Sequence, residues 1–140
     1  MYSRDHAVIS GLVGLPIVGI APSTEPLILL WAYVVLLGVG IDLDHFVIAR
    51  INHRDWRNLM RCLRQPSRAF VGQTTIFDSG DIWRDQRLLS HLVIGGGLAT
   101  LIWPINTYWA FATAVTVYTH LLADLYSDIR TREEYLQRNE

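Results

Sequence analysis

The sequence of 140 residues has no lysine, a single cysteine and little charge of either sign. Cys62 alone excludes an internal disulfide. Charged residues make up 18% of the chain, against about 25% in a typical soluble domain, and hydrophobic residues make up 51%. The net charge of -1 gives no general attraction to anionic partners, so no nucleic-acid binding is expected. The length is that of one domain, residues 1–140.

The few charges are missing altogether from three long segments. No aspartate, glutamate or arginine occurs in residues 7–24, 26–41 or 88–123. A soluble domain carries charge over its whole surface, so this pattern argues against a disordered chain, a soluble enzyme or a nucleic-acid module. It favours a small integral membrane protein that crosses the bilayer several times.

The uncharged segments predict an all-α fold, a four-helix transmembrane bundle, because each span needs about 20 apolar residues. We place the spans at about 6–22, 25–43, 88–104 and 107–125. The 36 uncharged residues 88–123 would form one helix about 54 Å long, which exceeds a single crossing. The sequence Trp103-Pro104-Ile105-Asn106-Thr107 is therefore predicted to divide them. The result is two hairpins joined by a long connection at about 46–87.

The arginines predict the orientation of this bundle. All twelve lie on the side that holds both termini and the long connection, and none lies in the two short turns. The positive-inside rule then places both termini and the connection in the cytoplasm. We expect a multi-pass protein of the inner or plasma membrane, and the sequence carries no signal for its oligomeric state.

The long connection contains a regular row of arginines. They recur at intervals of four and three residues, at Arg50, Arg54, Arg57, Arg61 and Arg64. With the apolar residues between them, they predict one basic amphipathic helix that lies on the cytoplasmic membrane surface and contacts anionic lipid headgroups. A solvated helix whose arginines only set the topology is the alternative. Pro66 is expected to end this helix, and Asp81 or Ser79 to cap the helix that leads into the third span.

Histidines and aspartates gather at the cytoplasmic ends of the predicted spans. They are His6, Asp42, Asp44, His45, His91, His120 and Asp124. The pairs Asp42 with His45 and His120 with Asp124 lie about one helical turn apart, so each pair can bind one ion. If the helix continues, the Asp44 side chain points away from the face that Asp42 and His45 share. Asp44 is then a ligand of another ion, a group that orients a ligand, or a general base.

The residue types favour a divalent metal site. Imidazole and carboxylate ligands without thiolates suit Zn²⁺, with Mn²⁺ or Fe²⁺ as alternatives. Such mixed ligand sets are typical of hydrolytic sites. Taken singly, His6 is an ordinary interfacial residue, the two aspartates of the second span are stop signals, and His120 with Asp124 is a hydrogen-bonded pair. Their convergence favours metal binding, because ionisable groups are costly at membrane depth.

The order of these motifs resembles a known family. Asp42-Leu43-Asp44-His45, then Arg87-Leu88-Leu89-Ser90-His91, then His120 and Asp124, all behind an early His6, are similar to the small membrane-bound metal-dependent hydrolases. The similarity covers nearly the whole chain, with departures around the first motif, where Ile41 replaces a proline, and around His91. That family in turn is remotely similar to zinc-dependent phospholipase C, which implies phosphoester hydrolysis.

We therefore expect a membrane-embedded metal-dependent hydrolase that cleaves a phosphoester or other ester of a phospholipid-like substrate at the cytoplasmic face. Asp44 and Arg87 are the candidate catalytic residues. Arg87 lies one turn before His91, where its guanidinium could bind a substrate phosphate, or it is simply one more topology charge. A non-catalytic metal-binding or transport protein and a structural membrane protein are the alternatives.

Overall fold

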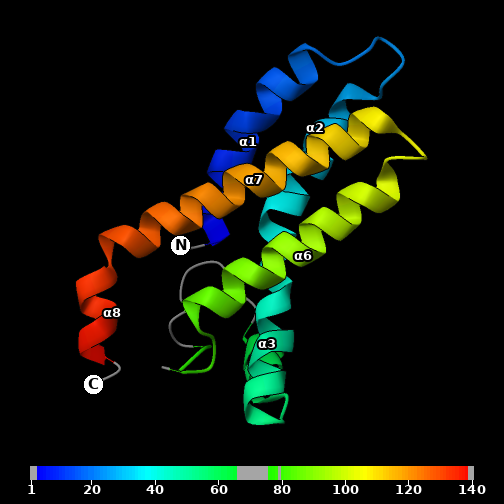
Figure 1. Cartoon of the computed structure of the whole chain (residues 1–140). Helices are drawn as coiled ribbons and strands as arrows, with labels where there is room; N and C mark the ends of the chain where they lie inside the picture. Colours follow the sequence, from blue (N-terminus) through cyan, green and yellow to red (C-terminus); the bar gives the residue numbers. More distant parts are fainter. Residues whose placement is uncertain (1–2, 66–75, 79, 139–140) are drawn as a thin grey trace.

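The computed structural model describes residues 3–65, 76–78 and 80–138, and this part of the chain is helical without a strand, which confirms the all-α prediction (Figure 1). The helices in chain order are α1 (Ser3–Gly19), α2 (Leu27–Gly40), the 3₁₀ turn η1 (Ile41–Leu43), α3 (Asp44–His53), α4 (Arg57–Arg64), α6 (Arg84–Ile102), α7 (Thr107–Arg130) and α8 (Arg132–Arg138).

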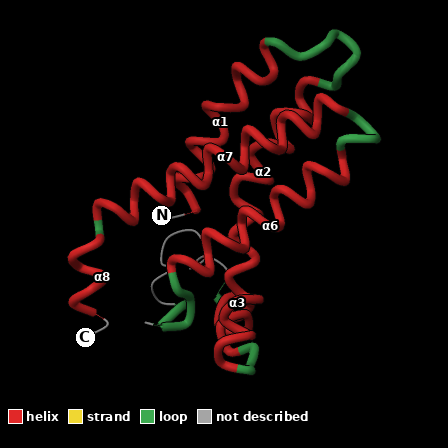
Figure 2. The backbone as a smooth tube through the Cα atoms, in the orientation of Figure 1, coloured by secondary structure: helices red, strands yellow, loops and turns green. Residues whose placement is uncertain are grey.

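The four longest helices form two hairpins, α1 with α2 and α6 with α7. The turns that close the two hairpins lie at the same end of the bundle (Figures 1 and 2). Helix α7 lies in the middle, because it packs against α1, α2 and α6 (Figure 1). The side chain of Glu25 links the two turns by accepting hydrogen bonds from Asn106 Nδ2 (3.0 Å) and Trp109 Nε1 (2.6 Å).

The buried interior is apolar near the turns and polar at the opposite end. The apolar part is formed by Ile17, Leu30, Val34 and Ala112. The outward faces of the hairpins carry large apolar side chains, and Ile28 and Leu101 are 84% and 72% exposed. This arrangement reverses that of a soluble bundle, in which polar side chains cover the outside.

By length and hydropathy, one helical stretch of the described residues, Leu27–His53, is able to cross a membrane. Helix α1 has only 17 residues. Helix α6 opens with charged residues, and α7 contains many threonine and tyrosine side chains. A single such stretch is weak evidence for a membrane, and the four-span bundle is not supported by this measure.

The row of arginines does not form one helix. The helical chain continues from α2 through η1 into α3 and ends at Arg54, whose backbone is left-handed with a φ of 62°. The Asp55 carboxylate then accepts a hydrogen bond from the backbone N–H of Arg57, at the start of α4. The predicted single helix from Arg50 to Arg64 is therefore wrong, because α3 ends at His53 and α4 begins only at Arg57. Pro66 lies outside the described residues.

Asp81 does not cap the helix that follows it. Helix α6 begins at Arg84, and the Gln86 side chain accepts a hydrogen bond from the N–H of Trp83. The Asp81 carboxylate is instead fully buried, and it contacts His53 Nε2 (2.8 Å), Asn58 Nδ2 (2.6 Å) and an Arg57 guanidinium nitrogen (3.2 Å). It thereby ties α3 and α4 to the segment before α6. Ser79, the other predicted cap, is outside the described residues.

Gly38 on α2 lies where three helices pack closely together. A Cβ atom at this position would overlap the hydroxyl of Ser10 on α1 and would lie 3.6 Å from the methyl carbon of Thr116 on α7. Only glycine therefore lets α1, α2 and α7 pack this closely.

We expect Gly38→Ala to lower the free energy of unfolding by about 1–3 kcal/mol, because the added methyl group pushes packed helices apart. Gly96→Ala on α6 is the matched control, since a Cβ there meets no atom within 4 Å. The control should leave stability unchanged or raise it by up to about 1 kcal/mol. Thermal unfolding of the purified variants measures both effects, and equal midpoints would contradict the packing argument.

Candidate metal centre

The polar end of the bundle brings together all seven residues predicted as metal ligands. This His/Asp cluster consists of His6, Asp42, Asp44, His45, His91, His120 and Asp124. They come from α1, η1, α3, α6 and α7, so three of the four long helices and the turn that follows α2 contribute to it. All are buried except His45, whose side chain is 13% exposed.

Asp42 is at the centre of the cluster. Its Oδ1 atom lies 3.3 Å from Nε2 of His120, 3.4 Å from Nε2 of His91 and 3.6 Å from Nε2 of His45. The η1 turn explains this position, because it links α2 and α3 directly and directs the Asp42 side chain into the bundle. Three imidazoles from three elements thus face one carboxylate oxygen.

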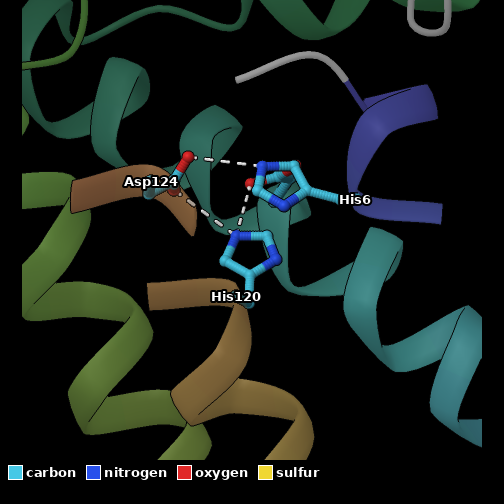
Figure 3. Close-up of side chains that lie close together, drawn as sticks. His6, His120 and Asp124 are labelled. Carbon is cyan, nitrogen blue, oxygen red and sulfur yellow. Dashed lines mark ion pairs between the residues drawn. The ribbon is translucent and has the colours of Figure 1, made fainter. Parts of the chain in front are cut away.

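Asp124 holds the other side of the cluster (Figure 3). Its Oδ1 atom lies 3.3 Å from Nε2 of His6, and its Oδ2 atom lies 3.5 Å from Nε2 of His120. The same Oδ2 atom is 3.7 Å from Nε2 of His91. The rings of His6 and His120 stack with their centroids 3.8 Å apart, which brings α1 against α7.

These separations are those of ligands around a common ion. The contacts of 3.3–3.7 Å between imidazole nitrogens and carboxylate oxygens exceed the usual hydrogen-bond distance of about 2.7–3.2 Å. Two ligand atoms at about 2.0–2.1 Å from a tetrahedral ion are about 3.4 Å apart. The cluster therefore has the spacing that a divalent cation requires.

Two of the histidines are oriented by hydrogen bonds on their other ring nitrogen. Nδ1 of His120 lies 2.9 Å from the carbonyl oxygen of Gly38, and Nδ1 of His91 lies 2.8 Å from Oδ2 of Asp44. A carbonyl or a carboxylate accepts a hydrogen bond, so each Nδ1 carries a proton and each Nε2 faces the carboxylates of the cluster. Metal-binding histidines are held in this way.

Whether the cluster suits a metal ion can be tested on its buried atoms that lack a hydrogen-bond partner among the described residues. In the cluster they include His6 Nδ1, Asp42 Oδ1, Asp44 Oδ1, His45 Nε2, His91 Nε2 and His120 Nε2. Leaving one such group unsatisfied costs about 1–3 kcal/mol, so a concentration of them at one place needs an explanation. Imidazole nitrogens and carboxylate oxygens aimed at one another fit a divalent cation.

Within the described residues, two groups could each hold a metal ion. One consists of His6, Asp42, His120 and Asp124, and the other consists of Asp42, His45 and His91. Asp42 belongs to both groups, so it is the natural bridge if two ions bind. Asp44 is in neither group, and its Oδ2 atom contacts Nδ1 of His91 and accepts a hydrogen bond from the hydroxyl of Ser90.

Arg87 faces carboxylates of the protein itself. Its Nη2 atom donates to Asp128 Oδ2 at 2.7 Å, and its Nε atom lies 3.4 Å from Asp124 Oδ2. Arg84 contacts Asp128 as well, through Nε at 3.3 Å. The guanidinium of Arg87 therefore supports Asp124 from behind and is already engaged by two side chains.

Sequence reasoning missed three groups that shape this centre. Asp128 could have been found, because it lies one helical turn after Asp124 on the same face of α7. Ser90 was quoted only as part of the motif that precedes His91, yet its hydroxyl donates a hydrogen bond to Asp44. The carbonyl of Gly38 has no sequence signal, since only the packing of α2 against α7 brings it to His120.

Comparisons of this chain with models of protein families, with curated proteins and with solved structures found no match. The resemblance to membrane-bound metal-dependent hydrolases accordingly stays a prediction from the quoted motifs.

We expect His120→Ala and Asp124→Ala each to lose most of the bound metal, because each removes a ligand atom from the same group. His53→Ala is the matched control, since His53 contacts Asp81 outside the cluster. Elemental analysis of purified protein after exposure to Zn²⁺ measures the metal content. A stoichiometry that is equal in all three variants would show that the cluster is a hydrogen-bonded structural core.

Proposed function

We propose that this protein is a membrane-embedded metal-dependent hydrolase that cleaves a phosphoester or other ester of a lipid at the cytoplasmic face of the membrane. The observation that carries the proposal is the buried His/Asp cluster, with two histidines oriented by Nδ1 hydrogen bonds. A divalent cation, when bound, supplies Lewis-acid activation of water and of an ester oxygen. Zn²⁺ is the first candidate, with Mn²⁺ and Fe²⁺ as alternatives.

The remaining residues have positioning roles in this proposal. Asp44 orients the imidazole of His91 and is itself held by the hydroxyl of Ser90. Arg87 orients Asp124 and balances part of the negative charge that the buried carboxylates bring into the bundle. We prefer this role for Arg87 to a phosphate clamp, because its guanidinium already contacts Asp124 and Asp128.

The membrane setting is supported by the outward faces of the helices. Leu12, Leu15, Ile28 and Leu101 are each at least 60% exposed, and lipid would cover such side chains. The uneven distribution of the twelve arginines supports a cytoplasmic location for the polar end. Four crossings, rather than the one that hydropathy alone supports, are part of the proposal.

A transport role is less favoured, although a non-catalytic metal-binding or structural protein is the main alternative. Transporters usually place their ion sites near the bilayer midplane, whereas this cluster lies at one end of the bundle. The other end has one acidic residue, Glu25, which is engaged by Asn106 and Trp109. No acidic path through the described residues leads from one end to the other.

Purified protein loaded with Zn²⁺ should hydrolyse members of a panel of phosphomonoesters, phosphodiesters and phospholipids, and chelation should abolish this turnover. Asp44→Asn should retain its metal but lose about 10–100-fold in turnover, because the amide no longer holds His91 as a carboxylate does. His53→Gln, outside the cluster, should be as active as the parent. A metal-loaded parent without turnover on any ester would identify the protein as a non-catalytic metal binder instead.

The proposed topology makes a separate prediction. A reporter enzyme that works only in the cytoplasm should be active when it is fused after Glu140. The same reporter should also be active when it is inserted between Asp55 and Trp56. A reporter placed in the turn at residues 22–26 should work only on the outer side. An outward-active fusion at Glu140 would contradict the orientation inferred from the arginines.

A further inference from the structure

A cavity of about 660 Å³ lies beside the His/Asp cluster. One wall is the continuous helical stretch α2–η1–α3, from Tyr33 to Ile51, and the other wall is the face of α6 from Ser90 to Leu98. The side chains that line it are almost all aliphatic. The volume is within the range of about 300–1,000 Å³ that is typical of ligand sites.

The polar groups of this groove connect it to the candidate metal centre. Asp44 and Ser90 line the cavity, bond to each other, and adjoin His91 through the 2.8 Å contact from Asp44 Oδ2 to His91 Nδ1. Tyr33 also lines the cavity, and its hydroxyl is hydrogen-bonded to Thr113. A molecule that fills the groove would therefore have an apolar body and a polar group near Asp44.

The shape of the groove indicates what the apolar body is. The wall from Tyr33 to Ile51 runs along about 27 Å of helix at 1.5 Å per residue, and the facing stretch of α6 from Ser90 to Leu98 runs along about 12 Å. The groove is therefore elongated, and its walls are almost entirely aliphatic. A chain of methylene groups can lie along such walls without burying a polar group, because its carbon atoms contact their neighbours at about 3.5–4.0 Å.

The groove is also open to the outside of the bundle along an apolar margin. Leu36, Leu43 and Ile51 line it and are each at least 65% exposed. All three belong to Leu27–His53, the stretch that is long and apolar enough to cross a membrane. A lipid chain could therefore enter sideways from the bilayer without crossing water.

We infer that this groove binds one acyl chain of a membrane lipid and places the adjoining ester or phosphoester group beside Asp44 and the candidate metal centre. The inference rests on the proposed function for the role of the polar end, and it names the substrate class as a lipid with at least one long acyl chain. Soluble esters would have no use for the groove.

Gly40→Phe tests the inference, because Gly40 lines the groove and a Cβ there meets no atom within 4 Å. Gly97→Phe is the matched control, since Gly97 is exposed on α6, lies outside the groove lining and is equally free of contacts. The proteins are placed in phosphatidylcholine vesicles that contain phosphatidylglycerol with a photoreactive diazirine on one acyl chain. After irradiation, mass spectrometry locates the lipid adducts.

In the parent, adducts should concentrate on groove residues such as Val47 and Ile94, and moving the diazirine along the chain should move the adducts along the groove. Gly40→Phe should reduce the groove adducts about tenfold, because filling the groove weakens the free energy of lipid binding by about 1.4 kcal/mol. Gly97→Phe should leave the adducts unchanged. Ile94→Trp, on the opposite wall, gives a second filled groove in case Gly40→Phe fails to fold.

Adducts spread evenly over the outer faces, or equal yields in both variants, would overturn the inference. Crosslinks between two chains without groove adducts would overturn it as well and would point to a second copy as the occupant. Turnover is measured on the same samples, so the two proposals can fail separately. Groove labelling without ester hydrolysis would contradict the proposed hydrolase function. Hydrolysis of short soluble esters without groove labelling would contradict the acyl-chain site.

Discussion

Burial of the Asp42 and Asp124 carboxylates is the constraint on which the rest of the molecule depends. They are 8% and 1% exposed, and a buried carboxylate is costly unless charged or hydrogen-bonding partners surround it. Three of the four long helices supply such a partner, with His6 on α1, His91 on α6 and His120 on α7. Packing the helices and assembling the candidate metal centre are therefore one and the same problem.

The close packing around Gly38 on α2 brings a backbone carbonyl into contact with this centre. Because Gly38 has no side chain, α2 approaches α1 and α7 closely enough for its carbonyl oxygen to reach Nδ1 of His120 at 2.9 Å. That contact determines which nitrogen of His120 faces the carboxylates. Asp44 does the same for His91 from the first turn of α3. The orientation of the ligands thus comes from groups that are not ligands.

Sequence patterns predicted the helical hairpins and the residues of the cluster, but not their local geometry. Uncharged segments and the break at Pro104 were enough for the hairpins, and the spacing of His120 and Asp124 was enough to place both on one face. The periodic arginines predicted one continuous helix, which is wrong because Arg54 adopts a left-handed backbone at the end of α3. Asp81 was predicted as a helix cap, but its buried carboxylate binds Asn58 and His53 instead. Both partners are distant from Asp81 in sequence. Contacts of that kind have no local pattern.

The two ends of the bundle differ in a way that suits the proposed lipid substrate. The turn end is closed by Glu25 with Asn106 and Trp109, and its interior is filled by Leu30 and other apolar side chains. The polar end holds buried imidazole and carboxylate atoms that lack a hydrogen-bond partner within the part of the chain that the structure describes, and the groove beside it is aliphatic. A polar metabolite approaching through that groove would lose its hydration along the aliphatic walls and gain no hydrogen bonds there before Asp44 and Ser90. A lipid already in the bilayer would leave one apolar environment for another, so only its headgroup would exchange water for the candidate metal centre.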